Sequence, residues 1–236
     1  MRTGEAESDV LSEIDSLITR GKKAIPRKSR RKKLKLYAEG LKAKLRQVDF
    51  ALAQLSQYQE QADGLTERTG SRAFSVTDQI QFYCDAFWTF LYSSLDVLAQ
   101  VINQALELGL NEQEVSFKKI EGHLRSKEKG NRLQVLVTKC RNSRPYRNLD
   151  NYRNCSIHRR QIYIEEELRI VRHTPGYESA TTTGPTVSVE RLLCKDPLSL
   201  TPEPDRRRKI PDYLEETREK IRNAIEDIVR AILPTK

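Results

Sequence analysis

The chain has 236 residues, of which 37% are hydrophobic and 32% charged, and its formal net charge is +9 at pH 7. This length suits one substantial domain with a small appendage, and the high charged fraction favours a helical bundle with much solvated surface over a thick α/β core. The sequence shows no apolar run long enough to span a membrane and no secretory signal, so we expect a cytoplasmic protein with no membrane partner.

The cysteines and the absence of familiar catalytic motifs exclude several further classes. The four cysteines lie far apart, and no Cys/His cluster has zinc-finger spacing. The sequence contains no P-loop, GxGxxG, HExxH or GxSxG motif. Three consecutive glutamates, Glu165 to Glu167, would alternate faces in a strand and would not converge on one ion. We therefore expect no metal and no cofactor.

Apolar residues at helical spacing predict helices through most of the chain. The first covers about residues 7–19, and the basic stretch around Pro26 follows it as an exposed linker. Further helices are predicted at about 33–61, 75–108, 131–142, 145–157 and 211–233, with a short helix or turn at 117–124. Gly109 is the predicted stop of the helix over 75–108, the third in the chain. The predicted buried side of the helix over 131–142 consists of Leu133, Val135, Leu136 and Val137.

The helix over residues 75–108 carries the broadest apolar stripe. A dense aromatic group between Phe82 and Tyr92 marks this helix as core. Its stripe is wider than one helix contact needs, so the helix is either central in a bundle or forms a subunit interface on one side.

Residues 161–195 differ in pattern from the rest of the chain. Residues 161–172 and 186–193 are rich in isoleucine, valine and leucine, and a loop containing proline and glycine separates them. This arrangement predicts a small β-hairpin with a long connection, placed before the C-terminal helix.

The excess positive charge is concentrated in two segments. Residues 21–35 contain nine Lys/Arg and no acid, and residues 125–160 contain eleven Lys/Arg against Glu128 and Asp150. Localised charge of this kind indicates a polyanionic partner such as RNA, DNA or an acidic protein. For residues 21–35 a flexible, solubilising arm explains the charge as well as binding does.

Residues 151–160, Asn-Tyr-Arg-Asn-Cys-Ser-Ile-His-Arg-Arg, carry the strongest chemical signal. Arg153 is a permanent cation, and His158, five residues later, is a titratable imidazole. Five residues turn a helix by roughly 140°, so one straight helix does not bring both side chains to one narrow face. They would reach a common cleft if the helix ended near His158, or if a second helix framed the cleft.

The sequence Arg153-Asn154-x-x-x-His158 resembles the R-x4-6-H motif of HEPN domains, including the polar residue that commonly follows the arginine. The resemblance covers about residues 75–158, with the C-terminal helix as a further candidate part. It implies a mainly α fold, a bundle of four to five core helices that forms a homodimer. It implies that two motif copies form a composite cleft near the dimer interface. Toxins of this type often carry tyrosine two residues after the histidine, where this chain has Arg160. That departure argues against the tyrosine-bearing toxin subgroup.

On this resemblance we divide the chain into residues 1–32, an N-terminal helix and basic linker, and residues 33–236, an HEPN-like helical domain. The β-rich stretch at about 161–195 is then an insertion into the minimal bundle.

Cleavage of RNA without a metal requires proton transfer from the 2′-OH and to the leaving 5′-oxygen, and stabilisation of charge on the phosphorane. His158 suits either proton transfer, and Arg153 suits bidentate binding of the phosphate. Asn154 would orient the phosphate, and the expected products carry a 2′,3′-cyclic phosphate and a 5′-hydroxyl. Residues expected to bind the RNA backbone are Arg147, Arg159 and Arg160.

The presence of His158 and Arg153 also has a purely structural explanation. His158 would also serve as a helix cap, and Arg153 would also serve as an ion-pair partner of Asp96 or Asp150. Asp96 is an acid on an otherwise apolar helix, and in HEPN domains residues of this kind on the corresponding helix often support the site.

The sequence thus leads to one main hypothesis, a metal-independent endoribonuclease of HEPN type. The resemblance implies RNA, a second copy of the chain, and an antitoxin or other partner protein as partners, in toxin–antitoxin or phage-defence responses. The alternative is a non-catalytic HEPN-like module that binds RNA, a nucleotide or a protein. A DNA-binding regulator using residues 22–35 lacks a convincing helix-turn-helix.

Overall fold

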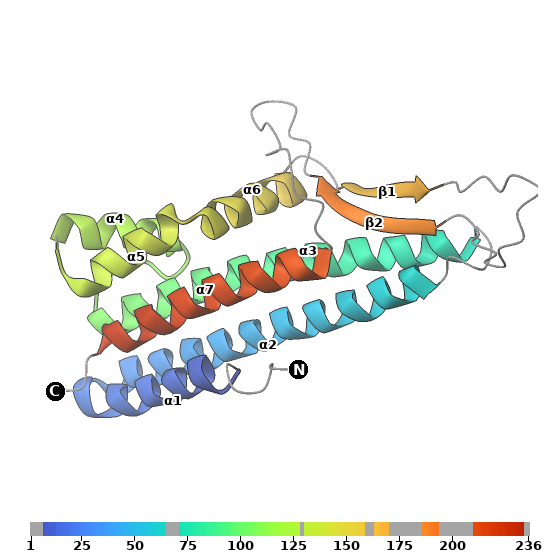
Figure 1. The fold of residues 1–236 in the computed structure, drawn as a ribbon. Coiled ribbons are helices and arrows are strands. Elements are labelled where there is room, and N and C mark those ends of the chain that lie inside the picture. Colours follow the sequence, from blue (N-terminus) through green and yellow to red (C-terminus); the bar gives the residue numbers. More distant parts are fainter. Residues whose placement is uncertain are drawn as a thin grey trace, which may run out of the picture. The chain divides into compact units, whose positions relative to one another are not determined.

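The computed structural model describes residues 7–64, 71–127, 130–158, 163–169, 186–193 and 210–233. Within these ranges the chain forms seven helices and one antiparallel pair of strands, which confirms the mainly helical fold (Figure 1). No helix in this described part has the length and apolar character that crossing a membrane requires. The helices are α1 (Glu7–Ala24), α2 (Lys28–Gly64), α3 (Ser71–Leu106), α4 (Phe117–Lys127), α5 (Arg132–Asn142), α6 (Arg144–His158) and α7 (Ile210–Ile232), and the strands are β1 (Tyr163–Arg169) and β2 (Thr186–Leu193).

The basic stretch near the N-terminus is mostly helical, so the predicted linker around Pro26 is wrong in extent. α1 continues to Ala24 and α2 already begins at Lys28, so only residues 25–27 connect them. Like charges repel each other in an isolated helix. Here several of these cations bind acids and backbone carbonyls of other segments, which offsets the repulsion and lets the helix start early.

The chain divides into two compact units. Unit 1 comprises residues 1–48, 89–151 and 217–236, and unit 2 comprises residues 49–88 and 152–216. The helices α2, α3, α6 and α7 each contribute residues to both units.

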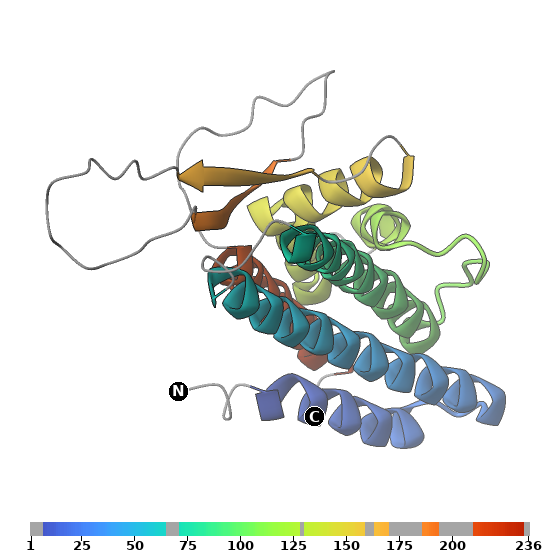
Figure 2. The same cartoon turned by 90° about the vertical axis from the view of Figure 1, so that its right-hand side faces the viewer.

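In unit 1, α1 packs along the first part of α2 (Figures 1 and 2). The approach is close at Gly21, where an added Cβ would lie 2.4 Å from the Cδ2 atom of Leu34. Lys42 of α2 is only 8% exposed, and its Nζ atom lies 2.7 Å from Asp15 of α1 and 2.9 Å from Glu39. Burial of this lysine is therefore compensated by two carboxylates, as a buried charge requires.

The C-terminal part of α7 also packs on α1 in unit 1. Arg230 of α7 binds Glu13 of α1 at 3.1 Å, and Arg20 donates to the carbonyl of Val229 at 3.2 Å. The buried hydrophobic residues of this part of α7 are Ile221, Ile225, Ile228, Val229 and Ile232, at the spacing of one helix face.

The helices α4 and α5 of unit 1 are joined by a buried carboxylate. Glu121 of α4 is 2% exposed and forms an ion pair with Arg125 on the next turn. Its Oε2 atom accepts from Arg141 of α5 at 2.6 Å, and its Oε1 atom, which binds Arg125, also accepts from the hydroxyl of Thr138 at 3.2 Å. One carboxylate thus fixes the distance between the two helices.

The exposed side of α5 differs from the prediction. Leu133, Val137 and Cys140 are buried, but Val135 is 52% exposed. The helix repeat explains the error, because positions 133, 137 and 140 share a face and position 135 lies on the other side.

The third helix ends at Leu106, before the predicted stop at Gly109. Glu107 adopts a left-handed conformation with φ of 57°, and the amide of Leu108 donates to the carbonyl of Asn103 at 3.2 Å. This is the bonding of a helix C-cap that usually holds glycine. Arg30 of α2 stabilises it by donating to the carbonyls of Gln104 and Ala105 at 2.6 Å and 2.8 Å.

Unit 2 contains an aromatic cluster from α2 and α3. Tyr83 stacks on Tyr58 with ring centroids 5.6 Å apart and makes edge contacts with Phe50 and Phe82. Phe82 is 65% exposed and Phe50 is 59% exposed, so this end of the predicted aromatic core lies at the surface. Phe87 and Trp88, one to two turns further along α3, are buried as predicted.

The strands β1 and β2 of unit 2 pair antiparallel from Tyr163 opposite Leu193 to Arg169 opposite Thr186. The pairing shifts register between Glu165 and Glu166, which is the position of a bulge.

Candidate functional site

Arg153, Asn154 and His158 lie in the last turns of α6, within unit 2. The helix ends at His158, close to the predicted end at residue 157. The structure describes only the backbone of these three residues, and Arg159 and Arg160 lie outside the described residues. The helical backbone separates Arg153 and His158 by roughly 140° around the axis, as the spacing predicted.

A tryptophan–tyrosine stack holds this end of α6 against α3. Tyr152 immediately precedes Arg153, and its ring stacks on Trp88 of α3 with centroids 4.2 Å apart and ring planes at 13°. Trp88 is 1% exposed and also contacts the rings of Phe87 and of Tyr213 in α7. An offset aromatic pair of this kind is worth about 0.5–1.5 kcal/mol beyond the area that it buries.

Asp85 is the half-buried acid of unit 2 that stands one turn before Trp88 on α3. Its carboxylate accepts from the amide of Gln81 at 3.4 Å. Because residues three apart on a helix share a face, Asp85 and Trp88 face the same direction. Trp88 faces Tyr152 of α6, so Asp85 lies on the side of α3 that faces the motif end of α6 in unit 2. Asp96 stands out in the sequence as an acid on an apolar helix, whereas Asp85 carries no such signal.

Asp96 lies in unit 1, where it binds the start of α4. Its Oδ1 atom accepts from the backbone amide of Phe117 at 3.4 Å, so it satisfies one of the free amides of that helix end. It also lies near Tyr146 of α6, whose pKa is raised above its usual range mainly by burial and further by the neighbouring Tyr92 and Asp150.

Among the described cations of residues 125–160, some form ion pairs within the fold and others are exposed. Arg125 and Arg141 bind the buried Glu121. Arg147, predicted to bind RNA, is exposed on α6 in unit 1. Part of the positive charge of residues 125–160 therefore forms ion pairs within the fold.

The described cysteines are poor nucleophiles. Cys84 and Cys140 are buried, and burial raises the pKa of both thiols, that of Cys140 to about 12. A thiol that stays protonated near neutral pH does not attack a substrate readily. Within the described residues, no three His, Cys, Asp or Glu side chains are grouped so that they would hold a metal ion.

The mainly helical fold and the Arg-x4-His sequence at the end of α6 agree with the HEPN class of domains. The model of the HEPN_Cthe2314-like HEPN family matches residues 37–190, more than half of the chain. The protein belongs to this family. The matched range includes α3 to α6 and β1, whereas α1 and α7 lie outside it. No curated protein and no solved structure matches the chain.

Proposed function

We propose that this protein is a metal-independent endoribonuclease in which Arg153 and His158 carry the cleavage chemistry. One observation supports the proposal above the others. The family match contains an Arg-x4-His sequence on the last turns of α6, and the Trp88–Tyr152 stack anchors that helix end to α3. An anchored helix end keeps reacting groups in place, which catalysis requires.

In the proposed reaction His158 takes the proton of the 2′-OH, and the 2′-oxygen attacks the adjacent phosphorus. Arg153 binds the non-bridging oxygens as charge develops on them. The bond to the 5′-oxygen then breaks, and that oxygen receives a proton from an imidazolium group. The products are a 2′,3′-cyclic phosphate and a 5′-hydroxyl.

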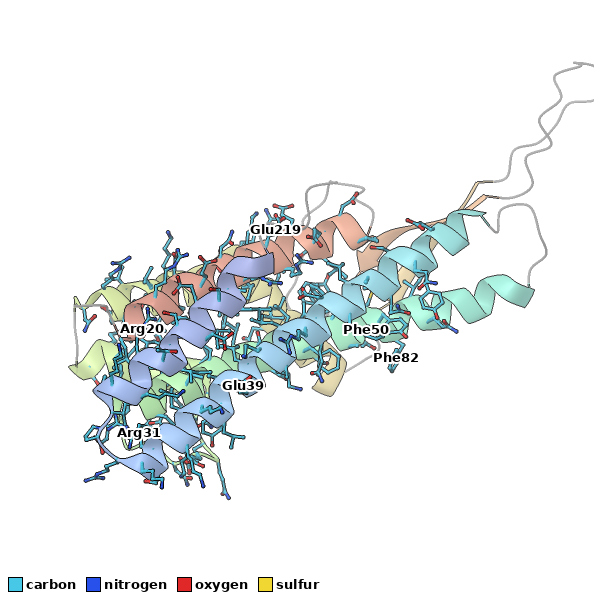
Figure 3. The ribbon with its side chains drawn as sticks, turned by 90° about the horizontal axis from the view of Figure 1, so that it is seen from below. Arg20, Arg31, Glu39, Phe50, Phe82 and Glu219 are labelled. Carbon is cyan, nitrogen blue, oxygen red and sulfur yellow. The ribbon has the colours of Figure 1, made fainter. Side chains whose placement is uncertain are left out.

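We include a homodimer in this proposal, because roughly 140° of helix rotation separates Arg153 from His158 and a second motif copy would complete the cleft. The exposed rings of Phe50 and Phe82 support it, since both contact Tyr83 and lie at the surface of the unit that carries the motif (Figure 3). Large exposed aromatic patches commonly mark protein interfaces. A dimer has twice the mass of the chain in light scattering.

Supporting residues belong to the same proposal. Asn154, next to Arg153, would orient the phosphate, while Arg147, Arg159 and Arg160 would bind the RNA backbone. Asp96 would act indirectly, through α4. We further propose that β1 and β2 are an insertion into a bundle of four to five helices, and that the enzyme acts in toxin–antitoxin or phage-defence responses.

Cleavage of an RNA panel in the presence of EDTA tests the enzyme. Arg153→Ala and His158→Ala should each lower the cleavage rate by about 10²- to 10⁴-fold, the range for loss of a general acid–base or of a charge-stabilising donor. Arg132→Ala and His123→Ala are matched controls on α5 and α4, and they should cleave like the wild type.

If wild type and both motif variants degrade RNA at equal rates, the activity belongs to a contaminant and the proposal fails. RNA binding that survives without any cleavage would instead identify a non-catalytic binding module.

A further inference from the structure

The basic segment over residues 21–35 contains two kinds of cation. Arg27 and Arg30 bind Glu107, at 3.3 Å and 2.5 Å, and Lys33 binds Glu112 at 2.5 Å. Arg31 donates to the carbonyl of Lys22 at 3.2 Å. The five other cations have exposed side chains and no ion-pair partner among the residues that the structure describes: Lys22, Lys23, Lys28, Lys32 and Lys35.

These five exposed residues lie on two adjoining helix ends of unit 1 and are here called the lysine face. Lys22 and Lys23 are in the last turn of α1. The bond from Arg31 to the Lys22 carbonyl joins that turn to the start of α2, where Arg31 lies (Figure 3). Lys28, Lys32 and Lys35 are four and three residues apart, so they form a row on one side of α2 about 10 Å long.

The fold does not explain the charge of this row. Lys23 and Lys22 interact favourably with the negative end of the α1 dipole, but α2 has no acid in its first turn. Its exposed lysines therefore repel one another and the positive end of their own helix. The nearby Glu107 and Glu112 are already bound by Arg27, Arg30 and Lys33. A polyanion laid across the row would remove this repulsion.

The composition of the face favours a nucleic-acid backbone over a protein. Residues 21–36 contain no aromatic residue, and Leu36 is the exposed large hydrophobic side chain beside the lysines. Protein interfaces are enriched in aromatic residues and depleted in lysine, whereas phosphate backbones are bound by lysine without sequence preference.

We propose that the lysine face binds the phosphate backbone of RNA, as a surface additional to the Arg153–His158 motif. This inference deepens the proposed function, since it assigns a second contact to the same substrate class. It gives residues 21–35 a binding role in place of a flexible solubilising arm.

Binding of a 2′-O-methyl oligoribonucleotide of about 20 nucleotides to the full chain tests this proposal, because this probe lacks the attacking hydroxyl and is not cleaved by the proposed chemistry. Fluorescence anisotropy over a range of salt concentrations gives the dependence of log Kobs on log salt. The variant Lys28→Ala/Lys32→Ala/Lys35→Ala should bind more weakly. Its slope should be about 2 smaller, from the release of counterions at about 0.7 per single-strand phosphate contact.

The control Arg46→Ala/Lys118→Ala/Lys119→Ala removes three exposed cations of unit 1 that lie outside both basic segments and changes the net charge equally. It should keep the slope of the wild type. An equal loss in both variants, or no loss in the lysine-face variant, overturns the proposal. So does binding to anionic phospholipid vesicles or to duplex DNA without binding to the oligoribonucleotide. Because the probe is uncleavable, this result is independent of whether Arg153 and His158 cleave RNA.

Discussion

Arg30 illustrates how one residue of a basic run acquires a structural role. Its side chain is 15% exposed and reaches two carbonyls at the end of α3 as well as the carboxylate of Glu107. Arg27 contacts the same carboxylate at 3.3 Å, but its side chain is 75% exposed. Hydrogen bonds of a charged donor to partly buried carbonyls contribute much more than an exposed ion pair does.

Arg30→Ala should therefore lower the free energy of unfolding by about 1.5–3 kcal/mol, because the end of α3 loses its charged donor. Arg27→Ala, which removes a contact to the same acid, should cost less than about 1 kcal/mol. Urea denaturation of the two variants beside the wild type measures both values. Equal losses for the two substitutions would contradict the role given to Arg30.

The roles of most single charged residues could not be predicted from the sequence. Charge counting located the basic segments correctly, but the partners of Arg30 and Lys33 lie more than seventy residues away along the chain, so local patterns carry no signal for them. The same holds for Asp96, whose bond to the start of α4 depends on tertiary packing. The roles of Arg153 and His158 remain a prediction from motif and family.

Among the helices, α6 matters most for the candidate site, because it carries the motif on its last turns. Helical periodicity predicted this helix and its end within about one residue, since its apolar spacing and Pro145 are local signals. The anchoring of α6 was not predicted, because the Trp88–Tyr152 stack joins residues 64 positions apart. At the basic stretch, periodicity ended α1 too early and began α2 too late, because distant partners compensate the charge there.

Tyr152→Ala should loosen the end of α6 without unfolding the chain. Loss of a stacked pair worth about 0.5–1.5 kcal/mol should speed hydrogen exchange of the amides of residues 152–158 by about three- to tenfold. Tyr152→Phe is the matched control, because it keeps the ring and removes only the hydroxyl. Exchange that is unchanged in Tyr152→Ala would show that the stack does not hold this helix end.

For the whole molecule, the helical class and the family followed from sequence, while the division into two units did not. The division cuts across α2, α3, α6 and α7, and no change of composition marks it along these helices. The family match ends at residue 190, yet α7 binds α1 in unit 1 through Arg230 and Glu13. Segments outside the family match thus pack with each other, which a pattern read along the chain does not reveal.

The chemical ends of the RNA products test the central claim most directly. Purified protein should cleave RNA in EDTA to fragments with a 2′,3′-cyclic phosphate and a 5′-hydroxyl, as mass spectrometry of the products would show. His158→Ala should yield none of these fragments in the same time. Fragments with a 5′-phosphate and a 3′-hydroxyl, or cyclic phosphate ends made equally well by His158→Ala, would contradict cleavage by 2′-OH attack through Arg153 and His158.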